Sequence, residues 1–97
     1  MNVILSGVSY GNCQEAIKKW GAPGIPYQLI REPDNPADIF AIRVSFLNDK
    51  LGYIPRGINK RFAEQMDAGK ELWASFVKRN EYPGAERIGI TVDIEEY

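Results

Sequence analysis

The sequence contains no histidine and only one cysteine among its 97 residues. Histidine is the usual general base and the usual nitrogen ligand of zinc, so neither role can be filled in the ordinary way. A Ser–His or Cys–His nucleophile cannot be assembled. The single Cys13 excludes a disulfide within the chain and a cysteine-rich zinc site. Cys13 falls on the apolar stripe of an expected helix and is predicted to be a core residue.

The chain also lacks a large excess of charge of either sign. Its 12 Lys and Arg residues face 13 Asp and Glu residues, which leaves a net charge of −1. Any nucleic-acid site must therefore be a local basic patch rather than a broadly basic surface. No apolar run approaches the roughly 20 residues of a membrane span. No glycine-rich phosphate-binding motif is present. We expect one cytoplasmic domain over 1–97, with no cofactor and no metal.

The hydrophobic periodicity alternates between that of strands and that of helices. Strands are expected at 3–10, 27–31, 41–47, 51–54, 72–79 and 87–95, and helices at 13–20 and 55–68. Asn12 and Glu15 suit a capping box at the start of the first helix, and Gly21 suits its end. The links between strands are short, which favours antiparallel pairing. The order β-α-β-β-β-α-β-β therefore predicts a mainly β, α+β domain: a small, six-stranded antiparallel curved sheet or partly closed barrel.

Basic residues gather in the middle of the chain. Five of them fall between positions 43 and 61, against the single acid Asp49: Arg43, Lys50, Arg56, Lys60 and Arg61. Tyr53 lies within this run, and Tyr10 ends the first expected strand. Cations that meet phosphates and rings that stack on bases are what single-stranded nucleic acid requires. A solvated basic face is the alternative interpretation.

Three carboxylates, Glu32, Asp34 and Asp38, lie close together around a proline-rich turn. Carboxylate oxygens could hold a hard cation such as Mg²⁺. The alternative is that Asp34 and Asp38 cap turns by bonding to nearby backbone groups. No further ligand or base is identifiable in the sequence.

Two segments resemble the HIRAN domain family. Positions 31–44 read REPDNPADIFAIRV, close to the family pattern R-E-P-x-N-P-Y-D-x-N-A-I-x-V. Positions 51–56 read LGYIPR, close to the L-G-Y-[IL]-P-like strand that leads into a helix, and positions 7–10, GVSY, are similar to the first strand. The resemblance covers nearly the whole chain and implies an OB-like barrel. HIRAN domains usually stand at the front of Swi/Snf-type helicase-like proteins of replication-fork repair, and some occur alone or beside nucleic-acid enzymes in bacteria and phages.

The resemblance implies capture of the 3′-hydroxyl end of single-stranded DNA. Carried over residue by residue, Tyr10 stands at the first stacking position and Asn35 at the base-contacting position. Asp38 stands where the family accepts a hydrogen bond from the 3′-OH. Tyr53 and Arg56 occupy the strand end and helix start that face the DNA. The phosphate contacts are expected from a further set of bases, Arg43, Lys60 and Arg61.

The sequence departs from the family pattern at a few positions. Ala37 replaces the second stacking tyrosine, Ile39 and Phe40 replace a polar–Asn pair, and Ser9 and Gly11 replace basic or aromatic residues found in some members. These departures leave three hypotheses open. The first is a non-catalytic 3′-end-binding module, nucleoid-associated where it binds DNA, that recruits a helicase, nuclease or other protein partner in DNA repair.

The second hypothesis is a stand-alone protein-interaction module of a bacterial or phage element that has lost DNA binding. A contiguous exposed apolar patch including Phe40, Trp73 or Tyr82 would support it. The third is a small metal-dependent enzyme using Asp34 and Asp38.

Overall fold

The computed structural model describes residues 1–96 and contains the helices and strands in the predicted order. The strands are β1 (Asn2–Ile4), β2 (Pro26–Arg31), β3 (Ile42–Phe46), β4 (Asp49–Tyr53), β5 (Leu72–Asn80) and β6 (Gly89–Glu96), and the helices are α1 (Cys13–Trp20) and α2 (Arg56–Asp67). The six strands form one antiparallel sheet in the order β1-β6-β5-β2-β3-β4. Neither helix of this described part is long and apolar enough to cross a membrane.

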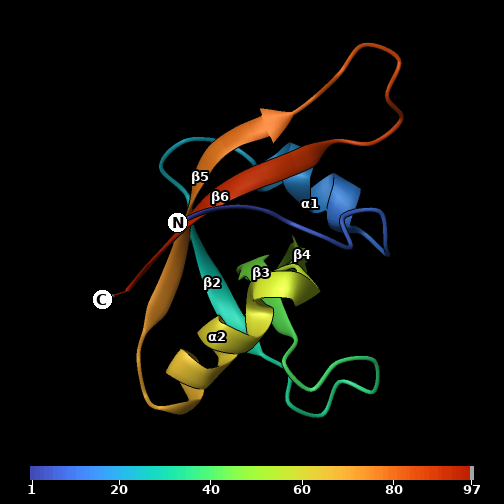
Figure 1. Ribbon diagram of the computed structural model, residues 1–97. Coiled ribbons are helices and arrows are strands. Elements are labelled where there is room, and N and C mark those ends of the chain that lie inside the picture. Colours follow the sequence, from blue (N-terminus) through green and yellow to red (C-terminus); the bar gives the residue numbers. More distant parts are fainter. Residues whose placement is uncertain (97) are drawn as a thin grey trace.

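The two edges of the sheet meet at one point. Ser6, just beyond β1, and Tyr53, at the end of β4, exchange two backbone hydrogen bonds of 2.9 Å each. Because β1 and β4 are the edge strands, this bridge curls the sheet into a partly closed barrel. The long β5–β6 hairpin projects beyond the barrel (Figure 1). The predicted fold class, a mainly β domain with two short helices, is confirmed.

The apolar core fills the inside of this curl. In β6, Ile90, Val92 and Ile94 point inward and are at most 5% exposed, as alternation along a strand requires. Residues from the other seven elements join them: Val3, Ala16, Ile17, Tyr27, Leu29, Ile42, Val44, Leu51, Phe62, Ala63, Leu72 and Ala74. Cys13 is also fully buried, as predicted, and this burial raises the pKa of its thiol.

The first strand is shorter than the sequence suggested. A strand was expected over 3–10, but β1 ends at Ile4. Gly7 has φ +68°, a left-handed conformation that a glycine adopts easily, and it turns the chain away from the sheet. The expected capping box is also wrong, since the Asn12 side chain makes no cap hydrogen bond.

A different polar side chain holds the start of α1. Gln14 Nε2 donates to the carbonyl oxygens of Val8 and Ile88 at 2.9 and 3.0 Å, and Gln14 Oε1 accepts from the Ile88 N–H at 2.8 Å. These bonds join α1 to the turn after β1 and to the residue before β6. The turn that carries Tyr10 is thereby fixed to the frame of the barrel.

Gly52 allows the barrel edges to approach each other. A Cβ added at this residue would lie 2.8 Å from the Ser6 carbonyl oxygen and 3.2 Å from Val8 Cγ1. We expect Gly52→Ala to lower the free energy of unfolding by about 1–3 kcal/mol, because backbone must shift to admit the methyl group. Urea unfolding measures this change.

Gly57→Ala is the matched control for that prediction. Gly57 lies in α2, and an added Cβ there meets no atom within 4 Å. Alanine is favoured over glycine in a helix by about 0.5–1 kcal/mol, so Gly57→Ala should leave stability unchanged or raise it. Equal losses in the two variants would show that Gly52 plays no special part in closing the barrel.

Candidate functional site

A cavity of about 390 Å³ opens where three connections of the chain meet. They are the turn after β1, the loop from β2 to β3, and the junction between β4 and α2. The first two, drawn in blue and green, lie on the same side of the molecule (Figure 1). The lining includes the whole set of residues expected at a 3′ end, namely Tyr10, Asn35, Asp38, Tyr53 and Arg56. The fold therefore brings together residues that are far apart in sequence.

Two tyrosine rings that line the cavity lie close to Gly7. A Cβ at Gly7 would lie 3.4 Å from Tyr53 Cδ2 and 3.6 Å from Tyr10 Cδ2. Tyr10 is 71% exposed, and the turn that carries it is closed by a hydrogen bond from the Tyr10 N–H to the Gly7 carbonyl. An exposed ring held in this way is a surface on which a nucleic-acid base can stack.

Asp38 is held by hydrogen bonds on both carboxylate oxygens. Oδ1 accepts from the Phe40 N–H at 2.9 Å, and Oδ2 accepts from Asn59 Nδ2 at 2.7 Å. The backbone bond and then the Asn59 bond hold the pKa of this carboxyl below its ordinary value, with a smaller contribution from Arg56 at 3.8 Å. Asp38 is therefore ionised at neutral pH and can act only as a hydrogen-bond acceptor.

Asn59 was not singled out by the sequence, although a signal for it exists. It lies among the apolar positions of α2, beside Ile58 and three residues before Phe62, and is 2% exposed. A polar residue buried on an apolar helix face needs a hydrogen-bond partner. That partner is Asp38, which shows that α2 positions the carboxylate as well as covering the core.

Glu32 links three side chains around the cavity. Its Oε1 accepts from the Tyr53 hydroxyl at 2.9 Å and from Asn35 Nδ2 at 3.0 Å, and its Oε2 lies 3.4 Å from Arg43 Nη1. Burial, followed by the bond to this carboxylate, raises the pKa of Tyr53. Asn35 Oδ1 also accepts from the Ala37 N–H at 2.9 Å. Asn35 is therefore a turn former as well as a cavity residue.

The basic residues expected to contact DNA lie in different parts of the surface. Arg56 is exposed at the cavity and donates through Nη2 to the Ala37 carbonyl at 2.9 Å. Arg43 stands opposite Tyr53 in the β3–β4 pair. Lys60 and Arg61 lie on α2, where the Lys60 ammonium is 5.6 Å from the centre of the Phe40 ring and Arg61 Nη2 is 3.2 Å from Met1 Sδ. None of these last three residues lines the cavity.

The carboxylates around the proline-rich turn do not gather into a metal site. Among residues 1–96, no group of three His, Cys, Asp or Glu side chains is placed to hold a metal ion. Glu32 is engaged by Tyr53, Asn35 and Arg43, and Asp38 bonds to Phe40 and Asn59. These two carboxylates order the loop between β2 and β3.

The apolar side chains considered for a protein interface also lie apart. Tyr82 is 70% exposed in the β5–β6 connection, whereas Phe40 packs against the core. Trp73 lines a hollow on β2 and β5 together with Phe46 and Leu47. Phe40, Trp73 and Tyr82 share none of the larger hollows of the described residues.

Comparison with known proteins adds to this geometry. The model of the HIRAN domain family matches residues 3–96. The HIRAN domain of human HLTF has a similar structure, with a TM-score of 0.72 and 17% identity over 99% of this chain and 73% of that chain. A protein from Lactobacillus plantarum has a TM-score of 0.73 and 27% identity over 97% of this chain and 91% of that chain. No protein with a curated description matches the sequence.

Proposed function

The chain belongs to the HIRAN domain family, and from this membership we propose that it binds the 3′-hydroxyl end of single-stranded DNA without catalysing a reaction. Similarity to the family supports a DNA-binding module. The specificity for an end, and for a free hydroxyl, is the proposal. One observation carries it: an ionised carboxylate, Asp38, lines the cavity beside the exposed Tyr10 ring.

The Asp38 carboxylate can distinguish an end from an internal stretch of DNA. A terminal 3′-hydroxyl offers a proton to an acceptor, whereas an internal phosphodiester offers none and is repelled by the negative charge. Each Asp38 oxygen already accepts one bond from the protein, and a carboxylate has about four acceptor positions. A further bond from the ligand hydroxyl can therefore be added without losing the bonds that orient the group.

The other cavity residues have supporting roles in this proposal. Tyr10 stacks on a terminal base, and Tyr53 supplies a second ring, which its hydroxyl bond to Glu32 holds in place. Asn35 contacts a base edge through its remaining amide hydrogen, and Arg56 faces a phosphate. Arg43, Lys60 and Arg61 are proposed as outer phosphate contacts. Bound in this way, the module would position a helicase, nuclease or other partner at a DNA end in repair or replication.

Competition between linear and circular DNA tests the proposal. A short linear oligonucleotide with a 3′-hydroxyl and a circular single strand of the same sequence would compete for the protein against a labelled linear probe. The linear strand should compete and the circular strand should not, because only the first has an end. Equal competition would mean that the cavity binds internal DNA and that end recognition is absent.

The affinity for such an end should be constant between pH 5 and pH 8. The chain has no histidine, and the pKa of Asp38 is lowered from an ordinary value of 3.8, so the acceptor stays charged over this whole range. Binding should weaken only below about pH 4, as the carboxyl is protonated. Dissociation constants at pH 5.0, 6.5 and 8.0 measure this. A gain in affinity toward pH 5 would contradict a charged acceptor.

A further inference from the structure

We propose that a second hollow, between α1 and the β3–β4 turn, binds the sugar–phosphate backbone on the 5′ side of the terminal nucleotides. The inference rests on the proposed function, since it continues the same strand beyond the cavity. This hollow has a volume of about 590 Å³. Its charged lining consists of Glu15, Lys19, Asp49 and Lys50.

Two separate segments of the chain each run from the cavity to the second hollow. Tyr10 lines the cavity, and the next residues, Gly11 and Asn12, line the second hollow. Across from them, Tyr53 lines the cavity, and the ammonium of Lys50 lies 5.1 Å from the centre of the Tyr53 ring. A strand whose last base stacks on Tyr10 can therefore pass directly into the second hollow.

Lys50 is the cation best placed to receive a phosphate on this path. It has no ion-pair partner among the described residues, and its contact with the Tyr53 ring is the interaction that holds it. Lys50 and Tyr53 are both half-buried. A cation–π contact between such residues is worth about 0.5–2 kcal/mol, so Lys50 can reorient toward a phosphate.

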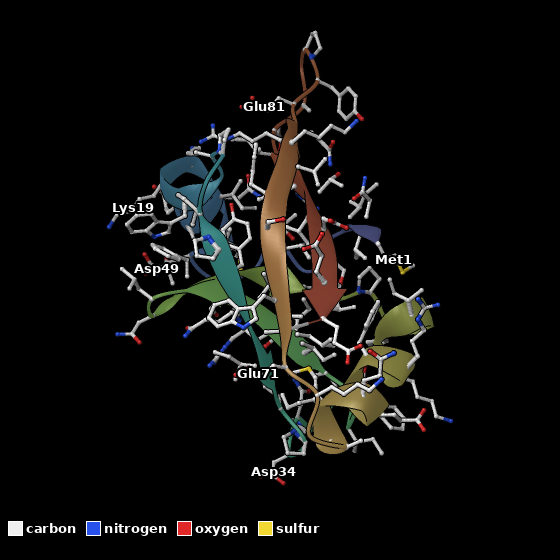
Figure 2. The ribbon with its side chains drawn as sticks, turned by 90° about the vertical axis from the view of Figure 1, so that its left-hand side faces the viewer. Met1, Lys19, Asp34, Asp49, Glu71 and Glu81 are labelled. Carbon is white, nitrogen blue, oxygen red and sulfur yellow. The ribbon has the colours of Figure 1, made fainter. Side chains whose placement is uncertain are left out.

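The other charged residues of the hollow determine how strongly it can bind a phosphate. The Lys19 ammonium lies 4.9 Å from the centre of the Trp20 ring, and Lys19 and Asp49 both project from the same edge of the molecule (Figure 2). Asp49 Oδ2 accepts from Trp20 Nε1 at 2.7 Å, so part of its acceptor capacity is used. Glu15 is exposed and would repel a phosphate. Its removal should therefore strengthen binding.

The alternative path for the strand runs along α2. Lys60 and Arg61 lie there, but the Arg61 guanidinium is directed to Met1 Sδ and Lys60 lies over Phe40. Neither residue lines the cavity or the second hollow. The path over Tyr53 and Lys50 is therefore favoured for the phosphates next to the cavity, which leaves Lys60 and Arg61 as outer contacts.

Oligonucleotides of two lengths distinguish binding at the second hollow from binding in the cavity alone. Binding of a thymidine dinucleotide and a thymidine hexanucleotide, both with a 3′-hydroxyl, would be measured for the wild-type protein, Lys50→Ala, Lys60→Ala as the test of the α2 path, and Lys78→Ala as the control. Loss of one phosphate contact to a single strand should weaken binding roughly eightfold at 50 mM salt and reduce the salt slope by about 0.7. We expect this loss for Lys50→Ala with the hexanucleotide and no change with the dinucleotide.

Three controls make the outcome decisive. Lys78→Ala removes the same charge from the exposed face of β5, away from both hollows, and should change neither affinity. Lys50→Arg should restore hexanucleotide binding, and Glu15→Gln should strengthen it. Loss of hexanucleotide affinity in Lys60→Ala but not in Lys50→Ala would overturn the inference in favour of the α2 path. Equal affinity of the wild-type protein for both lengths would also overturn it. The proposed function fails separately, if the dinucleotide binds no better with a 3′-hydroxyl than with a 3′-phosphate.

Discussion

Asp38→Asn should weaken binding of a 3′-hydroxyl oligonucleotide by about 10- to 150-fold, the equivalent of the roughly 1.5–3 kcal/mol that a hydrogen bond to a charged group contributes. The substitution keeps the shape of the side chain but removes its charge. Repulsion of a 3′-phosphate falls at the same time, so the affinities for the two ends should converge. Fluorescence anisotropy with both oligonucleotides at low salt measures the two effects together.

Asp34→Asn is the matched control for this variant. Asp34 belongs to the same loop and carries the same charge, but it is exposed and does not line the cavity. It should leave the preference for a 3′-hydroxyl unchanged. Urea unfolding of both variants checks that Asp38→Asn remains folded after losing its charged bonds to Phe40 and Asn59. If a folded Asp38→Asn protein kept its preference for a 3′-hydroxyl over a 3′-phosphate, the carboxylate would not be the group that recognises the DNA end.

Ala37→Tyr should strengthen binding by about 5- to 150-fold. Ala37 lines the cavity and is exposed, and it occupies the position of the second stacking tyrosine in the family pattern. A ring that stacks on a base contributes about 1–3 kcal/mol. The Ala37 carbonyl accepts from Arg56, and its N–H donates to Asn35; both are backbone groups that the substitution keeps.

Ala37→Leu separates stacking from simple apolar contact. Leucine adds buried surface without an aromatic face, so it should increase affinity much less than tyrosine does. Titrations with a 3′-hydroxyl oligonucleotide compare the three proteins. Equal affinities of the alanine, leucine and tyrosine proteins would show that the DNA base does not reach position 37.

Most of the fold could be predicted from the sequence because its signals are local. The strict alternation of Ile90, Val92 and Ile94 marks a half-buried strand, and the spacing of apolar residues in α1 marks one face of a helix. The end of β1 could not be predicted in this way. It depends on the left-handed conformation of Gly7 and on the bridge between Ser6 and Tyr53, which form only when the sheet curls.

The candidate site could likewise be predicted only where its signals are local. The sequence motifs named five of the residues that line the cavity, because each of the five lies in a short recognisable segment. They did not predict that Asn59 holds Asp38 or that Glu32 ties together Tyr53 and Asn35, since these contacts join residues from different elements. The position of Lys50 between two hollows likewise depends on how β4 packs beside α1.

The central claim is that this cavity recognises a free 3′-hydroxyl. The most direct test is the dissociation constant of the wild-type protein for one short single-stranded DNA that ends in a 3′-hydroxyl, compared with the same DNA ending in a 3′-phosphate. The hydroxyl form should bind at least about tenfold more tightly, because Asp38 accepts a hydrogen bond from the first and repels the second. Equal affinities, or tighter binding of the phosphate form, would contradict the claim.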